Sequence, residues 1–370
     1  MRILNIVSSN IVQDPRILKQ MQTIKSLTDD YVVLGKSNVN VTEKRLESLN
    51  FNYKLFGKAD NENSIVKKLL NRIKFGVKVI KFIRKYKPDV IHANDFDVLL
   101  ITYLSRYKKG KIIYDAHEIY SKNAFVNNYK ILSFIVQSVE KIIVSKIDSF
   151  ITVSHAAKGY YQSAGYKKNP IVVTNAPIKL ESDIVESQTS NEFEVVYQGQ
   201  IVSNRGYEEF LNAGLLIKEK GIQLVIRGFG EREGYLKDVK KKNEINNVRF
   251  DPPVEMDNLV SKLSESHVGV ILTKSTSINF EYTVSNKIFE CIHAGLPVIL
   301  SPVKEHIYLN NKYSFGIVLD EVTPENIANA IMDLFNNKEK YNILKNNAIE
   351  ASQILTWQNE SNKLIEIYKD

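Results

Sequence analysis

The sequence predicts an α/β protein built from two doubly wound domains, each with a parallel sheet between layers of helices. Short apolar segments alternate with longer amphipathic segments through the first half of the 370 residues. A polar stretch from Lys179 to Glu192 interrupts the alternation, which then resumes. Repeated strand–helix–strand order is typical of a parallel sheet covered on both faces, and the polar interruption is typical of a linker.

The elements of the first half follow from apolar periodicity. Strands are expected at Leu4–Val7, Tyr31–Leu34, Val90–Ala93, Ile112–Asp115, Phe150–Val153 and Ile171–Thr174. Helices are expected between them, at Pro15–Lys25, Ser64–Tyr86, Val98–Arg106, Lys130–Ile147 and Ala156–Ser163. The crossovers that join the parallel strands should be right-handed.

The second half repeats this pattern. Strands are expected at Glu194–Tyr197, Gln223–Arg227, Val248–Phe250, Val268–Leu272, Val298–Leu300 and Gly316–Leu319. Helices are expected at Gly206–Lys218, Glu231–Lys242, Met256–Ser264, Asn286–Ala294, Pro324–Phe335, Lys338–Ala351 and Trp357–Tyr368. We therefore expect one domain over residues 1–178, a second over 193–352, and a terminal helical segment over 353–370.

The composition is that of an ordinary globular protein. A hydrophobic content of 44% with 25% charged residues is close to the average for soluble domains. The single cysteine, Cys291, excludes an internal disulfide framework and fits a reducing compartment. The N-terminal apolar run is too short for a signal peptide, and no stretch has the length of a transmembrane helix. We therefore expect a cytoplasmic protein.

Positive charge is concentrated in one expected helix. The net charge is +8, and the segment Ser64–Lys87 holds nine basic residues and no acidic one. These basic residues interleave with aliphatic side chains rather than with stacking aromatics, which disfavours binding to nucleic acid. The pattern indicates a basic amphipathic helix that docks on an anionic membrane surface. The alternative is an ordinary outer helix of the sheet with a solvated basic face.

The most informative segment runs from Ser285 to Ile299. It reads as a short helix in which Ser285 caps the start, Gly295 takes the left-handed position after the end, and Pro297 stops continuation. An apolar run from Val298 then indicates a buried strand.

The start of this helix suits a nucleotide. A helix N-terminus at Asn286 presents N–H groups and a positive dipole end to a phosphate. Glu290 lies one turn later on the same face, where its carboxylate can accept hydrogen bonds from ribose hydroxyls. The alternative is that Glu290 is a solvated helix carboxylate with Lys287 as its surface partner.

The same segment resembles the nucleotide-sugar motif of the retaining, group 1 glycosyltransferases (glycosyltransferase family 4), which have the GT-B fold. That motif has two Glu residues separated by seven positions, followed by a small-residue turn and Pro-Val-Ile. Glu290 matches the second Glu, whereas Tyr282 stands at the first, next to Glu281. In a subset of the family, the capsule and cell-wall enzymes, the motif begins in a similar way, with Tyr in this region. Whether Tyr282 or Glu281 replaces the first Glu stays open. The resemblance implies two Rossmann-like domains facing a central cleft, and a last helix that returns to the N-terminal domain.

Three loops before this motif extend the resemblance. The turn at Gly199, followed by Arg205-Gly206, resembles the family element in which a basic residue contacts the nucleotide diphosphate, so Arg205 is implied in that role. The loop around Gly228 lies near the nucleotide in the family. The segment with Pro253 resembles the segment that contacts the base through backbone groups.

One expected strand end in the first half carries a cluster of titratable residues. The run Tyr114-Asp115-Ala116-His117-Glu118 resembles the family segment whose His faces the donor sugar and leaving phosphate, which implies His117. Asp115 or Glu118 fixes the imidazole tautomer or caps the next helix.

Two Asp-containing motifs allow alternative interpretations. Asp14-Pro15-Arg16 opens a helix, so Asp14 is a helix cap, an acceptor contact, or both. Asp95-Phe96-Asp97 superficially matches a metal-binding motif of another glycosyltransferase fold, but Asp is also a common helix cap.

The implied reaction is transfer of a sugar from a UDP- or GDP-linked donor to a hydroxyl of a saccharide or lipid-linked saccharide acceptor, in cell-surface polysaccharide or glycolipid synthesis. The resemblance implies retention of configuration, His117, Arg205 and Lys287 as catalytic residues, and no cofactor or catalytic metal. The nucleotide would contact Gly199, Arg205, Gly228, Pro253, Ser285, Asn286, Lys287 and Glu290. The basic helix would hold the enzyme on the inner face of the plasma membrane. A sugar-nucleotide epimerase of the same fold, or a non-catalytic binding protein, are the alternatives.

Overall fold

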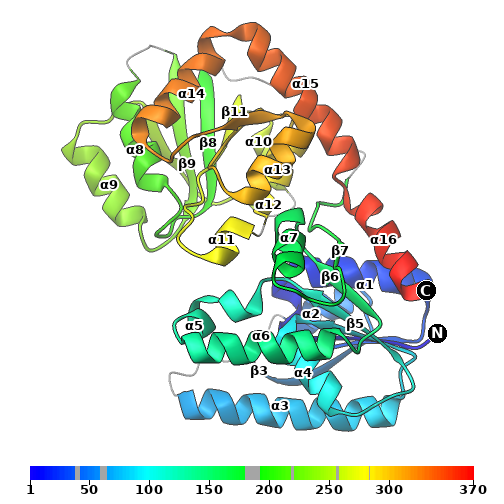
Figure 1. The fold of residues 1–370 in the computed structure, drawn as a ribbon. Helices are drawn as coiled ribbons and strands as arrows, with labels where there is room; N and C mark the ends of the chain where they lie inside the picture. The colour runs from blue at the N-terminus through cyan, green and yellow to red at the C-terminus, as the bar shows by residue number, and fades with distance from the viewer. Residues whose placement is uncertain (38–41, 59–64, 180–191, 218–220, 256–257, 283) are drawn as a thin grey trace. The chain divides into compact units, whose positions relative to one another are not determined.

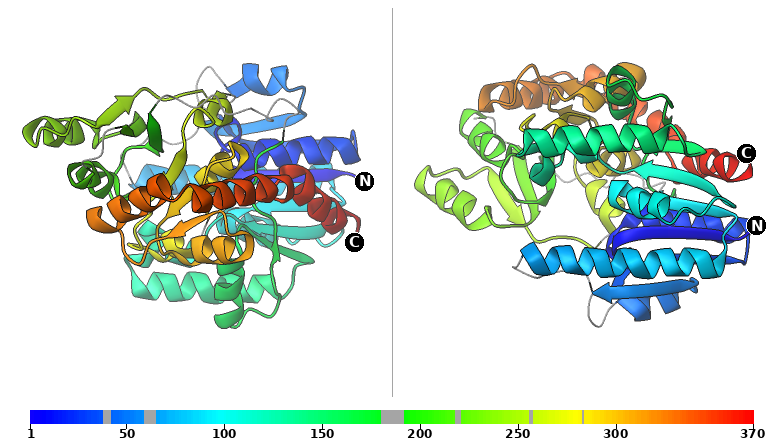
Figure 2. Two further views of the ribbon diagram at one scale, coloured as in Figure 1. Left: turned by 90° about the horizontal axis from the view of Figure 1, so that it is seen from above. Right: turned by 60° about the horizontal axis from the view of Figure 1, so that its bottom comes forward.

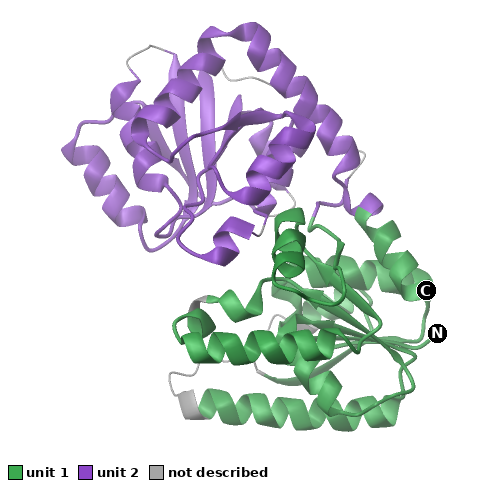
Figure 3. Cartoon of the chain, in the orientation of Figure 1, with its two compact units in different colours: residues 1–175, 360–370 green, residues 176–359 purple. Residues whose placement is uncertain are grey.

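The computed structural model describes residues 1–37, 42–58, 65–179, 192–217, 221–255, 258–282 and 284–370. They form two compact units: unit 1 holds Met1–Asn175 and Glu360–Asp370, and unit 2 holds Ala176–Asn359 (Figure 3). Within each unit, helices cover both faces of a parallel sheet (Figure 2). The predicted doubly wound α/β class is confirmed. Nearly all of the predicted linker, and Ser64 of the basic helix, lie outside the described residues.

Unit 1 has a seven-stranded sheet in the order β3-β2-β1-β4-β5-β6-β7, with every pair parallel. Figure 1 labels β3, β5, β6 and β7 of this sheet. The strands are β1 (Ile3–Asn10), β2 (Tyr31–Ser37), β3 (Tyr53–Lys58), β4 (Val90–Asn94), β5 (Lys111–Ala116), β6 (Ser149–Thr152) and β7 (Ile171–Val172). The α-helices are α1 (Pro15–Leu27), α2 (Thr42–Ser48), α3 (Ile65–Tyr86), α4 (Asp95–Leu104), α5 (Ala124–Asn127), α6 (Lys130–Val144) and α7 (His155–Ser163). The strand order reverses between β1 and β4, which is where ligands bind in open α/β sheets.

Unit 2 has a six-stranded parallel sheet in the order β10-β9-β8-β11-β12-β13. The strands are β8 (Phe193–Gln200), β9 (Ile222–Phe229), β10 (Val248–Asp251), β11 (Val268–Ile271), β12 (Val298–Leu300) and β13 (Gly316–Val318). The helices are α8 (Tyr207–Leu216), α9 (Glu233–Lys242), α10 (Leu259–Leu263), α11 (Ile278–Tyr282), α12 (Asn286–His293), α13 (Lys304–Tyr313), α14 (Pro324–Asn336) and α15 (Lys338–Ile354). The last helix, α16 (Trp357–Lys369), begins in unit 2 and belongs to unit 1 from Glu360 onward. The order reverses between β8 and β11.

The two faces of the unit 2 sheet carry separate cores. In β8, Val195 and Tyr197 pack with α8 and α14 on one face, whereas Val196 packs with α12 on the other. Successive side chains of a strand point to opposite faces, so a strand buried on both faces reads as a continuous apolar run. This is why the strands of unit 2 were recognisable from sequence.

Five strands and α-helices of the described residues were not predicted: β3, α2, α5, α11 and α13. Strand β3 lies at the sheet edge, and Lys54, Gly57 and Lys58 interrupt its apolar residues, so it lacks the apolar run of an inner strand. Helix α4 begins at Asp95, three residues before the expected start, because Asp95 and Phe96 read as part of a loop. No helix in the described part of the chain combines the length and the apolar character needed to cross a membrane.

Candidate functional site

Two glycines meet at the carboxyl edge of the unit 2 sheet. Gly199 of β8 pairs with Gly228 of β9, and their φ angles are +126° and +146°. A Cβ atom on Gly228 would collide with the Gly199 carbonyl group, and one on Gly199 would collide with the Lys287 side chain. Only glycine tolerates this backbone and this close approach. Gly199 therefore leaves the space that the end of the Lys287 side chain occupies, and Gly228 leaves room for the Gly199 carbonyl group.

Lys287 lies in the first turn of α12, with its ammonium group beside two stacked aromatic rings. Its Nζ is 5.2 Å from the centre of the Tyr197 ring and 5.9 Å from that of Tyr207. Burial, and then the positive charge of Arg205, lower the pKa of Lys287 to about 8. Lys287 forms no ion pair with any residue in the described ranges. The two aromatic faces and the charge of Glu290 thus compensate the ammonium group in part.

Arg205 is a second cation at the same edge of the sheet. Its guanidinium group lies 4.4 Å from the centre of the Phe280 ring, and its Nη1 donates to Thr273 Oγ1 over 3.2 Å. It precedes Gly206, the N-cap residue of α8, which has a φ of +66°. Arg205 likewise has no ion pair within the residues that the structure describes. Two cations without carboxylate partners are well placed to bind an anion.

Glu290 is held by a strand-end side chain. Gln198 Nε2 donates to Glu290 Oε2 over 2.9 Å, and burial raises the pKa of the carboxyl. Glu290 is half-buried, and Lys287 is not its ion-pair partner, which does not fit the alternative of a solvated surface pair. The carboxylate keeps acceptor capacity beyond the one hydrogen bond from Gln198.

The residues at the two ends of α12 are partly as predicted. Gly295 has a φ of +69° and confirms the left-handed position after the helix. Ser285 occupies the N-cap position, but its side chain makes no capping hydrogen bond, which corrects that expectation. Asn286 is the first residue of the helix and is exposed. Pro253 follows β10 and is also exposed.

Both candidates for the first Glu of the motif contact one lysine. Lys304 of α13 donates to the Tyr282 hydroxyl, and its Nζ lies 4.0 Å from the centre of the Tyr282 ring. The same Nζ is 3.5 Å from Glu281 Oε1. Helix α13 was not predicted, so this lysine could not be linked to the motif from sequence.

In unit 1, His117 lies after β5 among three carboxylates. Its Nδ1 is 3.6 Å from Asp14 Oδ2 and 3.7 Å from Asp95 Oδ2. Its Nε2 is 3.1 Å from Asn94 Oδ1 and 3.6 Å from Asp115 Oδ2. Burial opposes a charge on the ring, but the carboxylates outweigh burial and raise the pKa of His117 to about 9. His117 is therefore an imidazolium at neutral pH.

Asp115 is fully buried and paired with Arg16. Arg16 Nε and Nη2 each donate to its carboxylate over 2.9 Å, and Gln20 Nε2 donates over 2.7 Å. Burial alone would favour the neutral acid, but the Arg16 and His117 charges outweigh it and hold the pKa of Asp115 well below its usual range. Of the two residues expected to orient the imidazole, Asp115 is within 4 Å of it.

The first of the two Asp-containing motifs caps a helix, whereas the N-cap of α4 is Asn94, whose side chain makes no capping hydrogen bond. Asp14 Oδ1 accepts from the N–H groups of Arg16 and Ile17, which confirms Asp14 as the cap of α1. Asp97 Oδ1 accepts from the N–H group of Val98 over 2.9 Å. Asp95 has a φ of +68° and accepts from the N–H group of His117 over 3.2 Å. Within the described residues, no group of three or more His, Cys, Asp or Glu side chains is arranged to hold a metal ion.

Sequence reasoning missed the partners of these residues. Gln198 and Thr273 each lie at or just after the carboxyl end of a strand, a position that could have marked them. Phe280 belongs to the unpredicted helix α11. Arg16 was noted only within its motif, because its burial beside Asp115 depends on contacts 99 residues apart.

Two family models match the chain. Residues 181–351 match "Glycosyl transferases group 1", and residues 53–182 match "Glycosyltransferase Family 4". No sequence among curated proteins matches the chain.

Solved structures show the same two-domain fold. Anabaena HepE in complex with UDP is 17% identical, with a TM-score of 0.78 over 100% of both chains. HepE in complex with UDP-glucose is 16% identical, with a TM-score of 0.75 over 100% of this chain and 99% of that one. The lipopolysaccharide outer core galactosyltransferase WaaB is 12% identical, with a TM-score of 0.72 over 99% of both. The predicted GT-B fold is thereby confirmed.

The charge on His117 predicts a pH-dependent contribution to stability. Its pKa of about 9 exceeds the ordinary value of about 6.5. The contribution is therefore fully present below about pH 6.5 and is lost as the pH rises through about 9. His117→Gln should lower the free energy of unfolding by about 2–3 kcal/mol more at pH 6 than at pH 9.5, measured by urea denaturation. His155→Gln, in α7 of the same unit, is the control. An equal loss at both pH values would contradict the assignment.

Proposed function

We propose that this chain, a glycosyltransferase of the GT-B fold, transfers a sugar from a UDP- or GDP-linked donor to an acceptor hydroxyl with retention of configuration. The observation that supports this most strongly is the pair of cations, Lys287 and Arg205, at the carboxyl edge of the unit 2 sheet. Negative charge develops on the leaving diphosphate as the glycosidic bond breaks. Cations fixed in advance at that position stabilise the transition state more than the ground state.

The other residues of unit 2 bind the rest of the nucleotide in this proposal. Gly199 and Gly228 let the backbone approach the phosphates, and the start of α12 at Ser285 and Asn286 adds its positive dipole end. Glu290 accepts hydrogen bonds from the ribose hydroxyls. The backbone near Pro253 contacts the base. HepE, whose complexes contain UDP and UDP-glucose, supports a nucleotide-sugar donor.

His117 acts through its positive charge rather than as a base in this proposal. An imidazolium has no free lone pair to take a proton, so it stabilises the donor sugar and leaving phosphate electrostatically. The leaving phosphate takes the acceptor proton on the same face, which retains the configuration. The cap residue Asp14 contacts the acceptor.

The test of function is a transfer assay with UDP- and GDP-sugars, with NMR of the anomeric centre of the product. We expect transfer to a saccharide or lipid-linked saccharide, with configuration retained and activity unaffected by EDTA. Conversion of the donor without an acceptor would favour an epimerase. Loss of activity in EDTA that a divalent ion restores would revive the metal interpretation of Asp95 and Asp97.

Glu290→Ala should weaken nucleotide binding by about 1.5–3 kcal/mol, because it removes charged hydrogen bonds. Isothermal titration with UDP and GDP measures this. Glu233→Ala removes a carboxylate that pairs with Lys237 on the surface of α9 and is the matched control. If Glu290→Ala folds and binds the nucleotide unchanged, Glu290 does not belong to the site.

Arg205→Ala should reduce turnover more than it reduces binding of the bare nucleoside, because its partner is the diphosphate. Competition by uridine, UDP, guanosine and GDP separates the two effects. The affinity for the diphosphate should fall by tenfold or more, as expected for a lost charged hydrogen bond of about 1.5 kcal/mol. Equal losses for nucleoside and diphosphate would place Arg205 elsewhere on the ligand.

We further propose that helix α3 docks unit 1 on an anionic membrane, where a lipid-linked acceptor resides. Phe75, Val79 and Ile83 are buried, whereas four large apolar residues are 46–59% exposed: Leu69, Leu70, Ile73 and Val77. A helix with merely a solvated basic face would not expose this apolar surface. Exposed apolar groups beside basic ones suit insertion at a lipid headgroup boundary.

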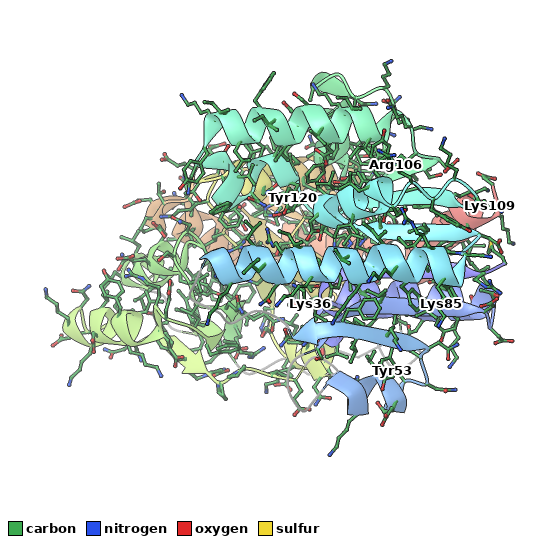
Figure 4. The ribbon with its side chains drawn as sticks, turned by 90° about the horizontal axis from the view of Figure 1, so that it is seen from below. Lys36, Tyr53, Lys85, Arg106, Lys109 and Tyr120 are labelled. Carbon is green, nitrogen blue, oxygen red and sulfur yellow. The ribbon has the colours of Figure 1, made fainter. Side chains whose placement is uncertain are left out.

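Helix α6 strengthens this proposal. Four of its apolar residues are 50–78% exposed: Ile131, Phe134, Ile135 and Ile142. Helix α4 packs against both α3 and α6, so the three helices form one layer of unit 1 (Figure 4). On the face shown there, Lys85 lies in α3, and Arg106 and Lys109 follow α4. Apolar and basic groups thus occur on several elements of one layer.

Vesicle co-sedimentation tests the docking. Binding should rise with the anionic lipid content, fall with salt, and drop when Lys74, Lys78, Lys81 and Lys85 become Gln, since each contributes about 1 kcal/mol near an anionic surface. Changing Lys237, Lys240, Lys241 and Lys242 of α9 to Gln removes the same charge from unit 2 and should leave binding unchanged. If the protein ignores anionic vesicles at low salt, a soluble acceptor becomes the better hypothesis.

A further inference from the structure

The last helix of the chain places a tyrosine inside unit 1. Helix α16 begins among the residues of unit 2 and continues in unit 1 from Glu360 onward. Glu360 is buried and accepts from the N–H group of Thr174 over 2.8 Å, which fixes this part of the helix. Tyr368, two turns later, is 1% exposed, and its ring centre lies 5.8 Å from that of His92.

The contact between Tyr368 and His92 determines where the imidazole proton resides. The Tyr368 hydroxyl is 2.6 Å from His92 Nδ1. Burial raises the pKa of the Tyr368 phenol well above its usual value and lowers the pKa of His92, so the phenol keeps its proton and the imidazole is neutral. The phenol is then the donor and Nδ1 the acceptor. The single ring proton of His92 must therefore lie on Nε2.

His92 Nε2 faces the carboxylate of Asp115. It is 3.5 Å from Asp115 Oδ2 and has no hydrogen-bond partner within the described residues. The same oxygen is 3.6 Å from His117 Nε2. A proton on His92 Nε2 favours the carboxylate, whereas the other tautomer would direct a lone pair at it. One carboxylate thus lies between a neutral histidine and a charged one.

We propose that Tyr368 and His92 are positioning residues for His117: the Tyr368 hydroxyl selects the His92 tautomer whose Nε2–H holds Asp115 as the carboxylate partner of His117. They are not catalytic residues, since they act through Asp115. The relevance to glycosyl transfer rests on the proposed function, but the arrangement itself does not.

Other charged groups also face His117, so loss of the tyrosine hydroxyl should weaken its charge without abolishing it. They are Asp14 before α1, Asp95 in α4, Glu118 after β5 and Arg16, which binds Asp115 from α1. The charge of Asp97 in α4 acts in turn on Asp95 and Glu118. These groups stay in place in a variant that removes only one hydroxyl.

The first measurement is NMR of the full chain with labelled histidine and no substrate. The ring nitrogen shifts of the wild-type protein should show the Nε2–H tautomer of His92. Tyr368→Phe should convert His92 partly to the other tautomer and lower the pKa of His117 by about half to one unit. A wild-type protein with the proton of His92 on Nδ1 would overturn the proposal without any variant.

The control removes a comparable buried hydroxyl elsewhere in unit 1. Tyr166 donates to the buried carboxylate of Glu140 over 2.5 Å, and Tyr166→Phe should leave His92 and His117 unchanged. If Tyr368→Phe only lowers stability, as Tyr166→Phe should, and changes neither histidine, then Tyr368 is merely structural. His92→Gln supplies an amide N–H toward Asp115 without needing Tyr368. On that background Tyr368→Phe should have no further effect on the pKa of His117, and a further shift would contradict the proposed order of contacts.

The second measurement is the pH dependence of kcat/KM. In Tyr368→Phe the alkaline limb should move to lower pH by the same amount as the pKa of His117. On a His117→Gln background, Tyr368→Phe should no longer change the pH dependence of kcat/KM. An absence of any transfer activity would refute the proposed function but leave the NMR test intact, so the two failures are distinguishable.

Discussion

The candidate donor site depends on holding two positive charges near each other with no ion pair to either of them among the residues that the structure describes. Lys287 and Arg205 repel one another, and burial further disfavours the charged lysine, which is why its pKa falls to about 8. The protein offsets this with the aromatic faces of Tyr197, Tyr207 and Phe280. Gly199 leaves room for the Lys287 side chain, and Gly228 leaves room for the Gly199 carbonyl group. An arrangement that is unfavourable when empty becomes favourable with a diphosphate bound, which is the basis of the proposed donor site.

Unit 1 holds a buried negative charge, rather than two positive ones, at the carboxyl edge of its own sheet. There a fully buried carboxylate, Asp115, is compensated by Arg16, Gln20 and two histidines. Breaking a buried pair of this kind leaves an uncompensated charge, so the network should be rigid. Both units place their charges at the carboxyl ends of parallel strands, where helix N-termini and loop backbones converge. The two charge clusters are therefore consequences of one topology that is repeated along the chain.

Sequence reasoning was most successful where a single segment carries its own signal. The inner strands were found because burial on both faces makes them continuously apolar, and α12 was located from Gly295 and Pro297. It failed where a role depends on contacts between distant segments. Tyr368 is one apolar position of an amphipathic helix until α16 brings it to His92, 276 residues away. Lys287 read equally well as a surface residue, because its aromatic neighbours come from β8 and α8. The edge strand β3 and the polar helix α13 lack a strong periodicity, so neither was predicted. Because α13 was missed, its residue Lys304 was not linked to Glu281 and Tyr282.

The central claim is that Lys287 meets the diphosphate of the donor, and proton uptake on binding tests it most directly. At pH 8 Lys287 is about half protonated, so a bound diphosphate should draw up to about half a proton onto it. Calorimetric titration of UDP or GDP, whichever binds more tightly, in buffers of different ionisation enthalpy measures this uptake. The account predicts uptake for the diphosphate, none for the matching nucleoside, and none for either ligand with Lys287→Met. Binding of the diphosphate without proton uptake, or equal uptake with the nucleoside, would contradict it.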